Sequence, residues 1–432
     1  MEKKTSYLFP LILVTSLFFF WGFVHNLDPI LIPHLRKVFN LTVLESSLVD
    51  SSIFIAYFLM ALPAGIIMRK YGYKSGILLG LLFFAIGSFL FIPAANTFKY
   101  VYFLGALFII ACGLAFLETA ANPYVTILGP EESAAQRLNF SQSFNGLAAA
   151  VAPIAGHWFF SSGGEVTKDQ IAAMTDAART TYLQSEAASV KTPYLILGVV
   201  ILIVAVLIYF TKLPDIKDQE EAAAEHKGLF HALKYKHLRG AVIAQFFYVG
   251  AQVCVGSFFV LIVTKSAGLS EGAAAKYASV YGLAFMIGRF VGTFLMRYFK
   301  PTQLLATYAI INIGLTAVAI FASGIVTVYA LIGIAFFMSI MFPTIFSLGI
   351  SNLGVDTKPA SSLIVMSIVG GALLPPVLGQ IADVTNNIQY GYVVALVCFV
   401  VVAWYGISGY KQTDVELPSG EEQKNVKILV SH

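Results

Sequence analysis

Long uncharged apolar runs alternate with short polar segments along the whole chain of 432 residues. A helix that crosses about 30 Å of hydrocarbon needs about 20 mostly apolar residues. Twelve such runs occur, at residues 8–32, 46–67, 75–94, 100–125, 138–161, 193–211, 238–264, 273–296, 302–322, 325–350, 359–382 and 389–410. The runs are continuous rather than alternating, which favours helices over barrel strands. The pattern predicts an all-α membrane protein with twelve transmembrane helices.

Composition and charge support this interpretation. Hydrophobic residues make up 58% of the chain and charged residues 12%, whereas soluble domains are about 25% charged. With both termini placed in the cytoplasm, eighteen of the 27 Lys and Arg residues fall in inner segments and eight in outer ones, the asymmetry typical of membrane proteins. The net charge of +4 therefore reflects topology, and we expect no nucleic-acid partner.

The longest charged interior segment divides the predicted helices into six and six. This division predicts an N-terminal six-helix bundle at residues 1–211, a cytoplasmic linker at 212–237, a C-terminal six-helix bundle at 238–410 and a cytoplasmic tail at 411–432. Transporters are often built from two such repeats around a central site. One large bundle with a long loop is the alternative. Twelve helices suffice for a monomer in the bilayer.

The segment GIIMRKYGYK at residues 65–74 resembles the loop signature of the major facilitator superfamily between its second and third helices. Met68 stands where that signature usually carries an Asp. Glycines permit close helix approach and can end a helix, and cations favour the cytoplasmic face. The resemblance implies a role in conformational switching for Gly65, Arg69, Lys70 and Gly72.

Three further motifs are more specific, namely LETAANP at residues 117–123, RLNFSQSFN at 137–145 and FPTIFSLG at 342–349. They resemble the fucose/galactose/glucose branch of that superfamily, the branch of L-fucose/proton symporters. The resemblance continues through residues 21–23, 244–252 and 288–292, so it covers nearly the whole chain. It implies a multi-pass protein of the bacterial inner membrane that imports L-fucose, galactose, glucose or a related hexose by alternating access.

Glu118 lies well inside the fourth predicted span, among apolar residues. An ionised carboxylate at the bilayer centre costs about 2.5 to 3.5 kcal/mol on insertion scales. The cost favours the neutral acid, which can gain and lose a proton during a transport cycle. A structural pair with a neighbouring helix is the alternative. The resemblance implies that Glu118 is linked to both the proton and the sugar.

Amide and aromatic side chains supply candidate sugar ligands. Gln142 and Asn145 are three residues apart, so they share one helical face, and amides offer both donors and acceptors to sugar hydroxyls. Hydrogen bonding between helices is the alternative role, and the resemblance favours sugar contact. The substrate-binding candidates are, in full, Asn26, Glu118, Gln142, Asn145, Gln245, Tyr248, Gln252 and Phe342. Phe342 replaces a Tyr that is frequent in the branch.

The first predicted span is interrupted by HNLDP at residues 25–29. Pro29 denies the carbonyl of His25 its helical donor, and broken helices are common at transport sites. Here the chain departs from the branch. Members of the branch have an essential aspartate at the position of Pro29 and an asparagine at the position of Asp28. A shift of one residue turns a side chain by about 100°, so Asp28 replaces that aspartate only if the backbone is distorted.

Two more ionisable residues lie within predicted spans. Asp50 either forms a cation site with Asp28 or is a solvated residue near the outer helix end. Arg289 either extends its charge to the cytoplasmic surface or counters a carboxylate across the cavity. We count it among the candidates for conformational switching. Proton coupling through Glu118 and sodium coupling through Asp28 and Asp50 are therefore both open.

Patterns of enzymes and metal sites do not occur at helical spacing. The sequence has no Ser/His/Asp, paired-aspartate, His-rich or phosphate-binding glycine arrangement within the spans. We therefore expect no enzymatic activity, no metal and no cofactor other than a co-transported proton or sodium ion. The preferred hypothesis is a sugar/proton symporter, with a sodium-coupled symporter and a non-transporting membrane sensor as the alternatives.

Overall fold

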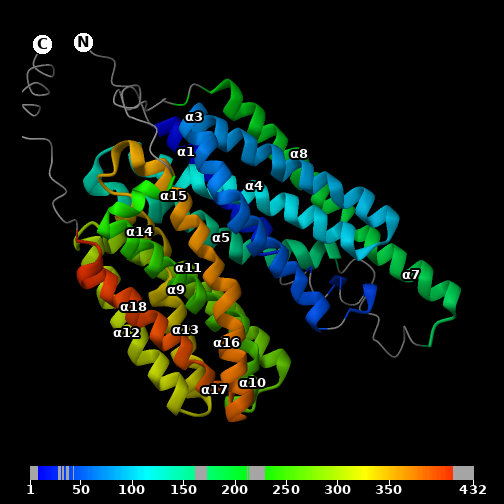
Figure 1. Cartoon of the computed structure of the whole chain (residues 1–432). Coiled ribbons are helices and arrows are strands. Elements are labelled where there is room, and N and C mark those ends of the chain that lie inside the picture. The colour runs from blue at the N-terminus through cyan, green and yellow to red at the C-terminus, as the bar shows by residue number, and fades with distance from the viewer. Residues whose placement is uncertain are drawn as a thin grey trace, which may run out of the picture.

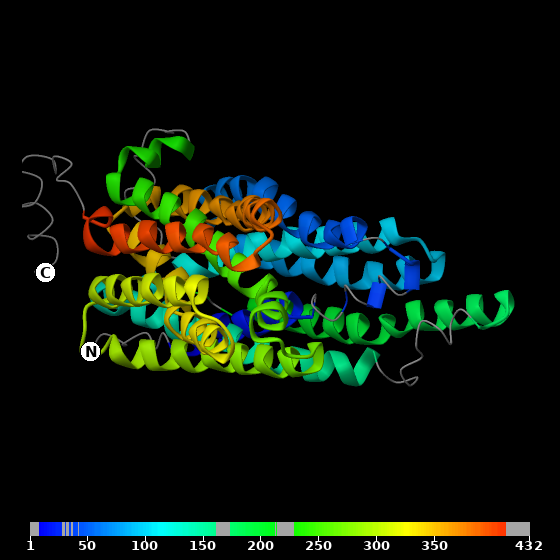
Figure 2. The ribbon, with the colours of Figure 1, turned by 90° about the horizontal axis from the view of Figure 1, so that it is seen from below.

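The computed structural model describes residues 8–27, 31, 34–35, 38–41, 43–160, 173–211, 213 and 229–411, and every regular element in these ranges is helical. The all-α prediction is therefore confirmed. The helices lie in two bundles that run side by side, one formed by the first half of the chain and one by the second (Figure 1, Figure 2).

The first bundle is built from α1 (Leu8–His25), α3 (Val43–Thr97), α4 (Tyr100–Ile127), α5 (Ala134–Phe160), α7 (Asp176–Ser189) and α8 (Lys191–Phe210). Helix α3 contains two crossings because Gly72, with φ 81° and ψ 170°, breaks the helical backbone within it. Only glycine adopts this conformation without strain. The signature glycine therefore ends one span and lets the chain turn into the next.

The second bundle contains several crossings made of two shorter helices. Its elements are η3 (Leu229–Lys234), α9 (Lys236–Ser257), α10 (Phe259–Ala267), α11 (Glu271–Leu295), α12 (Pro301–Phe321), α13 (Ile325–Met338), α14 (Met341–Gly349), α15 (Thr357–Met366), η5 (Ser367–Val369), α16 (Gly370–Thr385), α17 (Ile388–Gly391), α18 (Val393–Trp404) and η6 (Tyr405–Gly409). The pairs α9 with α10, α13 with α14, α15 with α16 and α17 with α18 each form one crossing.

Twelve crossings result within the described ranges. Nine helical segments are long and apolar enough to span a membrane, and one of them, Ser52–Thr97, holds two crossings joined at Gly72. The shorter apolar helix α1 and the 27-residue α5 supply the other two. The predicted number of transmembrane helices is confirmed.

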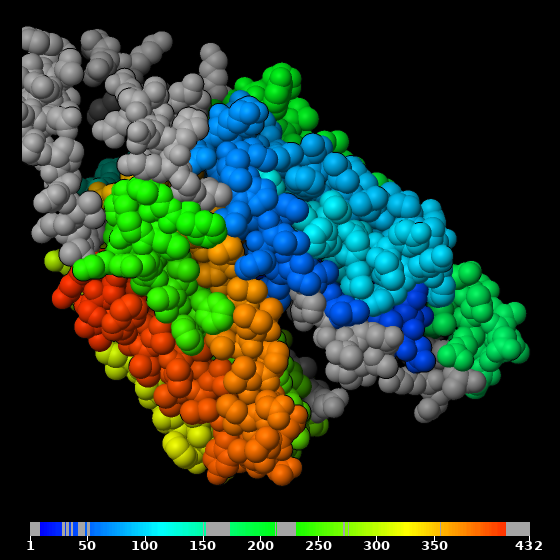
Figure 3. Space-filling model, in the orientation of Figure 1, coloured from blue at the N-terminus to red at the C-terminus, as the bar shows by residue number. Residues whose placement is uncertain are grey.

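The two bundles meet at one end and separate towards the other. At the closed end, where α4 ends and α5 begins, α15 packs on α3 and α4, and α14 and α11 pack on α5. Towards the opposite end, where α16 reaches α17, the bundles diverge and the surface between them is hollowed (Figure 3). We call this second end the open end.

The predicted linker, residues 212–237, lies largely outside the described residues. Helix α8 ends at Phe210 and α9 begins at Lys236, and the short helix η3, which precedes α9, packs on α15. Lys234 of η3 lies 3.5 Å from a carboxylate oxygen of Asp356, which precedes α15. The predicted tail beyond residue 411 also lies outside the described residues.

Close helix contacts within the first bundle depend on small residues. A Cβ atom at position 113 of α4 would lie 2.5 Å from the carbonyl oxygen of Gly80 and 2.6 Å from the backbone nitrogen of Phe84, both in α3. Because these are backbone atoms, they cannot move aside without displacing the helix. The two helices therefore touch at Gly80 and Gly113, in the manner of small-residue contacts in other membrane helices.

We expect Gly113→Ala to lower the unfolding temperature in detergent, because overpacking typically costs about 1 to 3 kcal/mol. Gly105→Ala is the matched control on the same helix, since no heavy atom lies within 4 Å of its Cβ position. Alanine there should be neutral or stabilise α4 by up to about 1 kcal/mol. Equal unfolding temperatures for the two variants would contradict the close contact.

Candidate transport site

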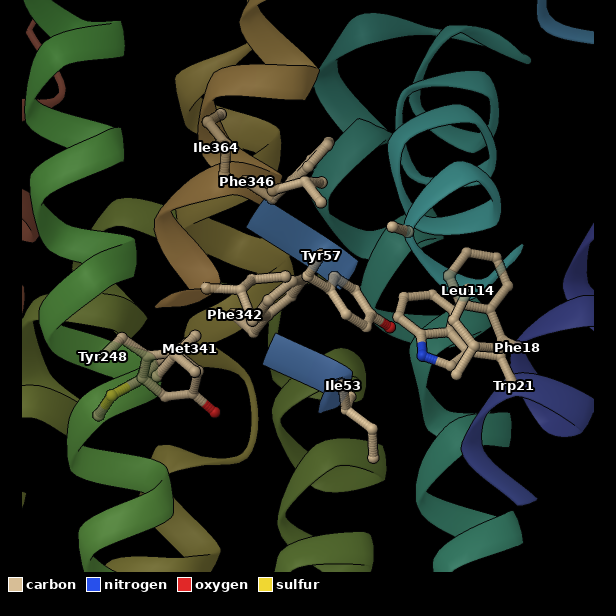
Figure 4. Packing of buried hydrophobic residues seen from close by; sticks show 14 of the residues in the cluster. Phe18, Trp21, Ile53, Tyr57, Leu114, Tyr248, Met341, Phe342, Phe346 and Ile364 are labelled. Carbon is tan, nitrogen blue, oxygen red and sulfur yellow. The ribbon is translucent and has the colours of Figure 1, made fainter. Parts of the chain in front are cut away.

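The candidate site lies where both bundles contribute aromatic side chains. Figure 4 shows Trp21 of α1 and Tyr57 of α3 on one side and Phe342 of α14 and Tyr248 of α9 on the other. The Tyr248 and Phe342 rings meet edge to face, with centroids 6.3 Å apart. These four side chains are at most 8% exposed. They give the interface between the bundles an apolar wall that can pack against the faces of a ring-shaped ligand.

Glu118 is an acidic residue beside this interface. It lies in α4 and is only 3% exposed. A hydrogen bond joins its carboxyl group to the hydroxyl of Tyr57, whose side chain points towards the α1 and α4 side in Figure 4. This phenol is a partner that the sequence did not reveal, because Tyr57 is one of 21 tyrosines and no motif distinguishes it.

A carboxamide pair extends the polar group one helical turn along α4. Gln142 of α5 donates from Nε2 to Oδ1 of Asn122 over 3.0 Å, and both residues are buried. The Nδ2 group of Asn122 has no hydrogen-bond acceptor among the described residues. Sequence reasoning named Gln142 but missed Asn122, although its spacing of four from Glu118 places the two on the same helical face.

Asn145 lies apart from this pair. Its side chain packs against α1, where a Cβ at position 22 would lie 2.7 Å from Cγ of Asn145. Gly22 therefore lets α1 approach α5 closely. Asn145 is half-buried, so of the two predicted amides Gln142 is engaged with α4 and Asn145 lies beside α1.

The residues predicted around the break in the first helix are described only in part. Helix α1 ends at His25, and Asn26 donates from Nδ2 to the carbonyl oxygen of Gly22 over 2.7 Å, which closes the last turn of the helix. Asp28 and Pro29 lie outside the described residues. Asp50 lies in α3, but its side chain is not described.

Two amide candidates of the second bundle, Gln245 and Gln252, lie on α9, and the aromatic candidate Phe342 lies on α14. Gln245 is fully buried, and neither its amide nitrogen nor its amide oxygen has a hydrogen-bond partner in the described part of the chain. Leaving such a group unpaired typically costs about 1 to 3 kcal/mol. Gln252 is half-buried two turns further along α9. Phe342 stacks on Phe346 at an interplanar angle of 15°.

Arg289 joins the two bundles. This buried side chain of α11 donates from Nε to the carbonyl oxygen of Ser339 over 2.8 Å and from Nη1 to that of Gln142 over 2.9 Å. Its guanidinium also lies over the ring of Phe285, 4.6 Å from the centroid. Both hydrogen-bond acceptors are backbone carbonyls, so the geometry corresponds neither to a charge extended to the surface nor to a carboxylate pair.

The Ser339 carbonyl is available to Arg289 for a local reason. A helical carbonyl normally accepts from the N–H group four residues later, but that position is Pro343, which has no N–H. The helix accordingly breaks between α13 and α14. Arg289 therefore satisfies a carbonyl that proline leaves without a donor and contacts the opposite bundle at the same time.

The sequence profile of the Major Facilitator Superfamily matches residues 11–374. This chain belongs to the Major Facilitator Superfamily. The L-fucose-proton symporter of Escherichia coli is 43% identical over 93% of this chain and 93% of its own length. A glucose/galactose transporter of Brucella abortus is 40% identical over 95% of this chain and 96% of its own length. The relatives are transporters, and this chain is a transporter rather than an enzyme.

The solved structures give the same result for the fold. The fucose:proton symporter FucP in the outward conformation is 41% identical, with a TM-score of 0.87 over 94% of this chain and 100% of that chain. A proton:xylose symporter of the superfamily is similar at 15% identity with a TM-score of 0.68, over 95% of this chain and 97% of that chain, which reflects the shared fold alone. The superfamily fold with two six-helix bundles is thereby established.

The superfamily loop signature lies at the closed end of the molecule. Gly65 faces α15, where a Cβ on this glycine would collide with Oγ of Ser362. Arg69 is half-buried and Lys70 exposed, with Nζ of Lys70 5.0 Å from the centroid of the Tyr71 ring. Met68, which replaces the usual Asp, is fully buried. The close approach at Gly65 thus crosses between the bundles, whereas Met68 packs as an apolar residue.

The closed end also contains a cavity of about 450 Å³. Residues of both bundles line it, among them Tyr73, Glu131, Ser351 and Lys358. None of the predicted sugar or ion ligands lines this cavity. It is therefore distinct from the interface that holds Glu118.

We expect Arg289→Lys to destabilise this transporter in detergent. A lysine keeps the charge but has no donor at the Nε position, so the Ser339 and Gln142 carbonyls cannot both keep their partners. Hydrogen bonds that involve charged groups typically contribute about 1.5 to 3 kcal/mol. Arg297→Lys, at an exposed position in the turn that follows α11, is the control and should change stability by less than about 0.5 kcal/mol. An unfolding temperature of Arg289→Lys equal to that of the control would exclude the bridging role.

Proposed function

We propose that the chain imports a monosaccharide together with a proton, by alternating access between its two bundles. The observation that carries the proposal is the buried Glu118, which is bonded to Tyr57 beside an interface of aromatic and carboxamide side chains. The names of the relatives, an L-fucose-proton symporter and a glucose/galactose transporter, support both the sugar and the proton. The candidate cargo is L-fucose, galactose, glucose or a related hexose.

Sugar recognition would use groups from both bundles. Gln142 and Asn145 offer amide donors and acceptors from the first bundle, and the unpaired amide of Gln245 offers both from the second. Tyr248, Gln252 and Asn26 extend this set. The apolar faces of a hexose would pack on aromatic rings such as Phe342. A ligand that contacts both bundles binds one arrangement of them better than the other, and only such differential affinity can shift the conformational equilibrium.

Glu118 would carry the coupled proton. When the bundles are open to the outside, the carboxyl group takes up a proton, and the neutral acid can then donate to a sugar hydroxyl or to Tyr57. After the bundles reverse, the site faces the cytoplasm, and loss of the proton weakens sugar binding. This scheme needs no resident metal or cofactor. A sodium-coupled alternative would instead use the carboxylates of Asp28 and Asp50.

The orientation follows from the charges at the closed end. The helix ends and turns there carry Arg137, Lys234, Arg297 and Lys358, and positive residues favour the cytoplasmic side of a bacterial inner membrane. We infer that the closed end and both termini face the cytoplasm. The open end would then face outwards, ready to receive sugar. The twelve crossings are sufficient for a monomer to function in the bilayer.

We expect Glu118→Gln to keep sugar exchange but lose uphill accumulation. Glutamine resembles the protonated acid in shape and cannot release a proton, so sugar moves without coupling. Under a gradient of one pH unit, which stores about 1.4 kcal/mol, the wild type should accumulate sugar up to about tenfold in proteoliposomes. The variant should only equalise the two sides while it still exchanges labelled for unlabelled sugar.

Glu132→Gln is the control for this experiment, because Glu132 is exposed in the connection between α4 and α5. It should accumulate sugar as the wild type does. Accumulation by Glu118→Gln to the level of this control would refute the coupling role of Glu118.

Imposed ion gradients should separate the two coupling hypotheses. We expect an inward proton gradient, with no sodium present, to drive uptake of L-fucose, galactose or glucose into proteoliposomes. An inward sodium gradient at equal pH on both sides should give no accumulation. The reverse result, together with loss of the sodium response in Asp28→Asn, would establish the sodium mechanism. Sugar binding without any uptake would identify a sensor.

A further inference from the structure

One backbone carbonyl of α4 cannot be satisfied within its own helix. The carbonyl of Thr119 would accept from the N–H group of residue 123, but Pro123 has none. The hydroxyl of Thr119 does not help, because it donates to the carbonyl of Ala115. In a buried, water-free position, an unpaired carbonyl costs about 1 to 3 kcal/mol.

The missing donor comes from the opposite bundle. Oγ of Ser361 in α15 donates to the Thr119 carbonyl oxygen over 2.8 Å. Both residues are fully buried, and α15 packs on α3 and α4 at the closed end. The hydrogen bond therefore forms only while the two bundles are together at this end.

We propose that Ser361 is a positioning residue that holds the closed end together through the carbonyl that Pro123 leaves free, next to Glu118 on α4. Thr119 directly follows Glu118, so the contact ties α15 to the segment that carries the coupling carboxyl. When the bundles separate at this end, water of the newly opened cavity replaces the serine hydroxyl. The bond thus favours the state that is open at the other end.

The expected size of this bias follows from the net value of a hydrogen bond. Loss of the Ser361 hydroxyl should shift the ratio of outward-open to inward-open molecules about two- to twelvefold towards inward-open, the range that corresponds to a typical intramolecular hydrogen bond. The inference uses the alternating access of the proposed function but neither its sugar nor its ion. A measurement without substrate therefore tests it separately from sugar/proton symport.

Spin-label distances across the open end measure this ratio directly. Labels at Val101 and Val384, which are 73% and 72% exposed near the ends of α4 and α16, report whether the bundles are apart or together there. The background protein has alanine in place of the three native cysteines, Cys112, Cys254 and Cys398. The distance distribution is recorded in nanodiscs at constant pH, without sugar.

Two pairs of variants separate the hydrogen bond from packing. Ser361→Val and Ser361→Thr have the same shape, but only threonine keeps the hydroxyl, so we expect the population shift in the valine variant alone. Ser367→Ala is the neighbouring control, because the hydroxyl of Ser367 donates to Ile364 within its own segment. It should leave the ratio unchanged. Equal distance distributions for the valine and threonine variants would overturn the proposal.

The dependence on proline is the sharpest test. In Pro123→Ala the new N–H group satisfies the Thr119 carbonyl within α4, so this variant should shift the ratio in the same direction as Ser361→Ala. Adding Ser361→Ala to it should then have no further effect. If Ser361→Ala shifts the ratio as much in the Pro123→Ala variant as in the protein with Pro123, the proposal is overturned. If Pro123→Ala does not fold, the valine and threonine pair decides.

Discussion

The structure depends on one constraint of the bilayer, which is that a backbone carbonyl in a water-free interior must find a donor in the protein. Prolines within helices α4 and α14 each leave one carbonyl without its helical N–H group. The Thr119 carbonyl accepts from Ser361 and the Ser339 carbonyl from Arg289. In both cases the donor comes from a different helix, so a local defect of one helix fixes the position of another.

Both contacts adjoin the candidate site and connect it to the second bundle. Thr119 follows Glu118 directly, and Arg289 also binds the carbonyl of Gln142, whose side chain contacts Asn122. Displacement of α15 or α11 relative to the first bundle therefore changes the surroundings of the buried carboxyl and its carboxamide neighbours. In the proposed mechanism, the same geometry would let protonation of Glu118 or sugar binding influence whether the closed end stays closed.

The fold was largely predictable from the sequence, because lipid allows few alternatives. Uncharged runs of about 20 residues predict crossings one by one, and even the composite crossings of the second bundle retain that length. The turn at Gly72 was also readable, since a glycine between the basic residues Lys70 and Lys74 is a local signal for a helix end. By contrast, the predicted linker between the bundles, at residues 212–237, and the predicted break of the first helix at Asp28 fall on parts of the chain that are largely not described.

Individual residues of the site could be predicted from the sequence, but their contacts with one another could not. Glu118, Gln142 and Arg289 are conspicuous because charged or amide groups are costly within a span. Their partners are the Tyr57 hydroxyl, the Asn122 amide and the backbone carbonyls of Ser339 and Gln142, and the sequence does not show which of these groups meets which side chain. Such partners depend on which helix faces which, and this is a property of the assembled bundles rather than of any one segment.

The chemistry of the closed end also explains how it can open again. Besides the contacts of Ser361 and Arg289, the bundles are joined there by the Asn139 and Thr344 side chains over 3.1 Å and by Ser351 and Glu131 over 2.8 Å. Each such bond contributes about 0.5 to 1.5 kcal/mol net, because water can replace it once the end opens. An interface of the same size made only of large apolar side chains would lose far more on exposure to water. Small polar contacts of this kind are exchanged for water at little cost, so in the proposed mechanism a proton and a sugar would decide between the two states.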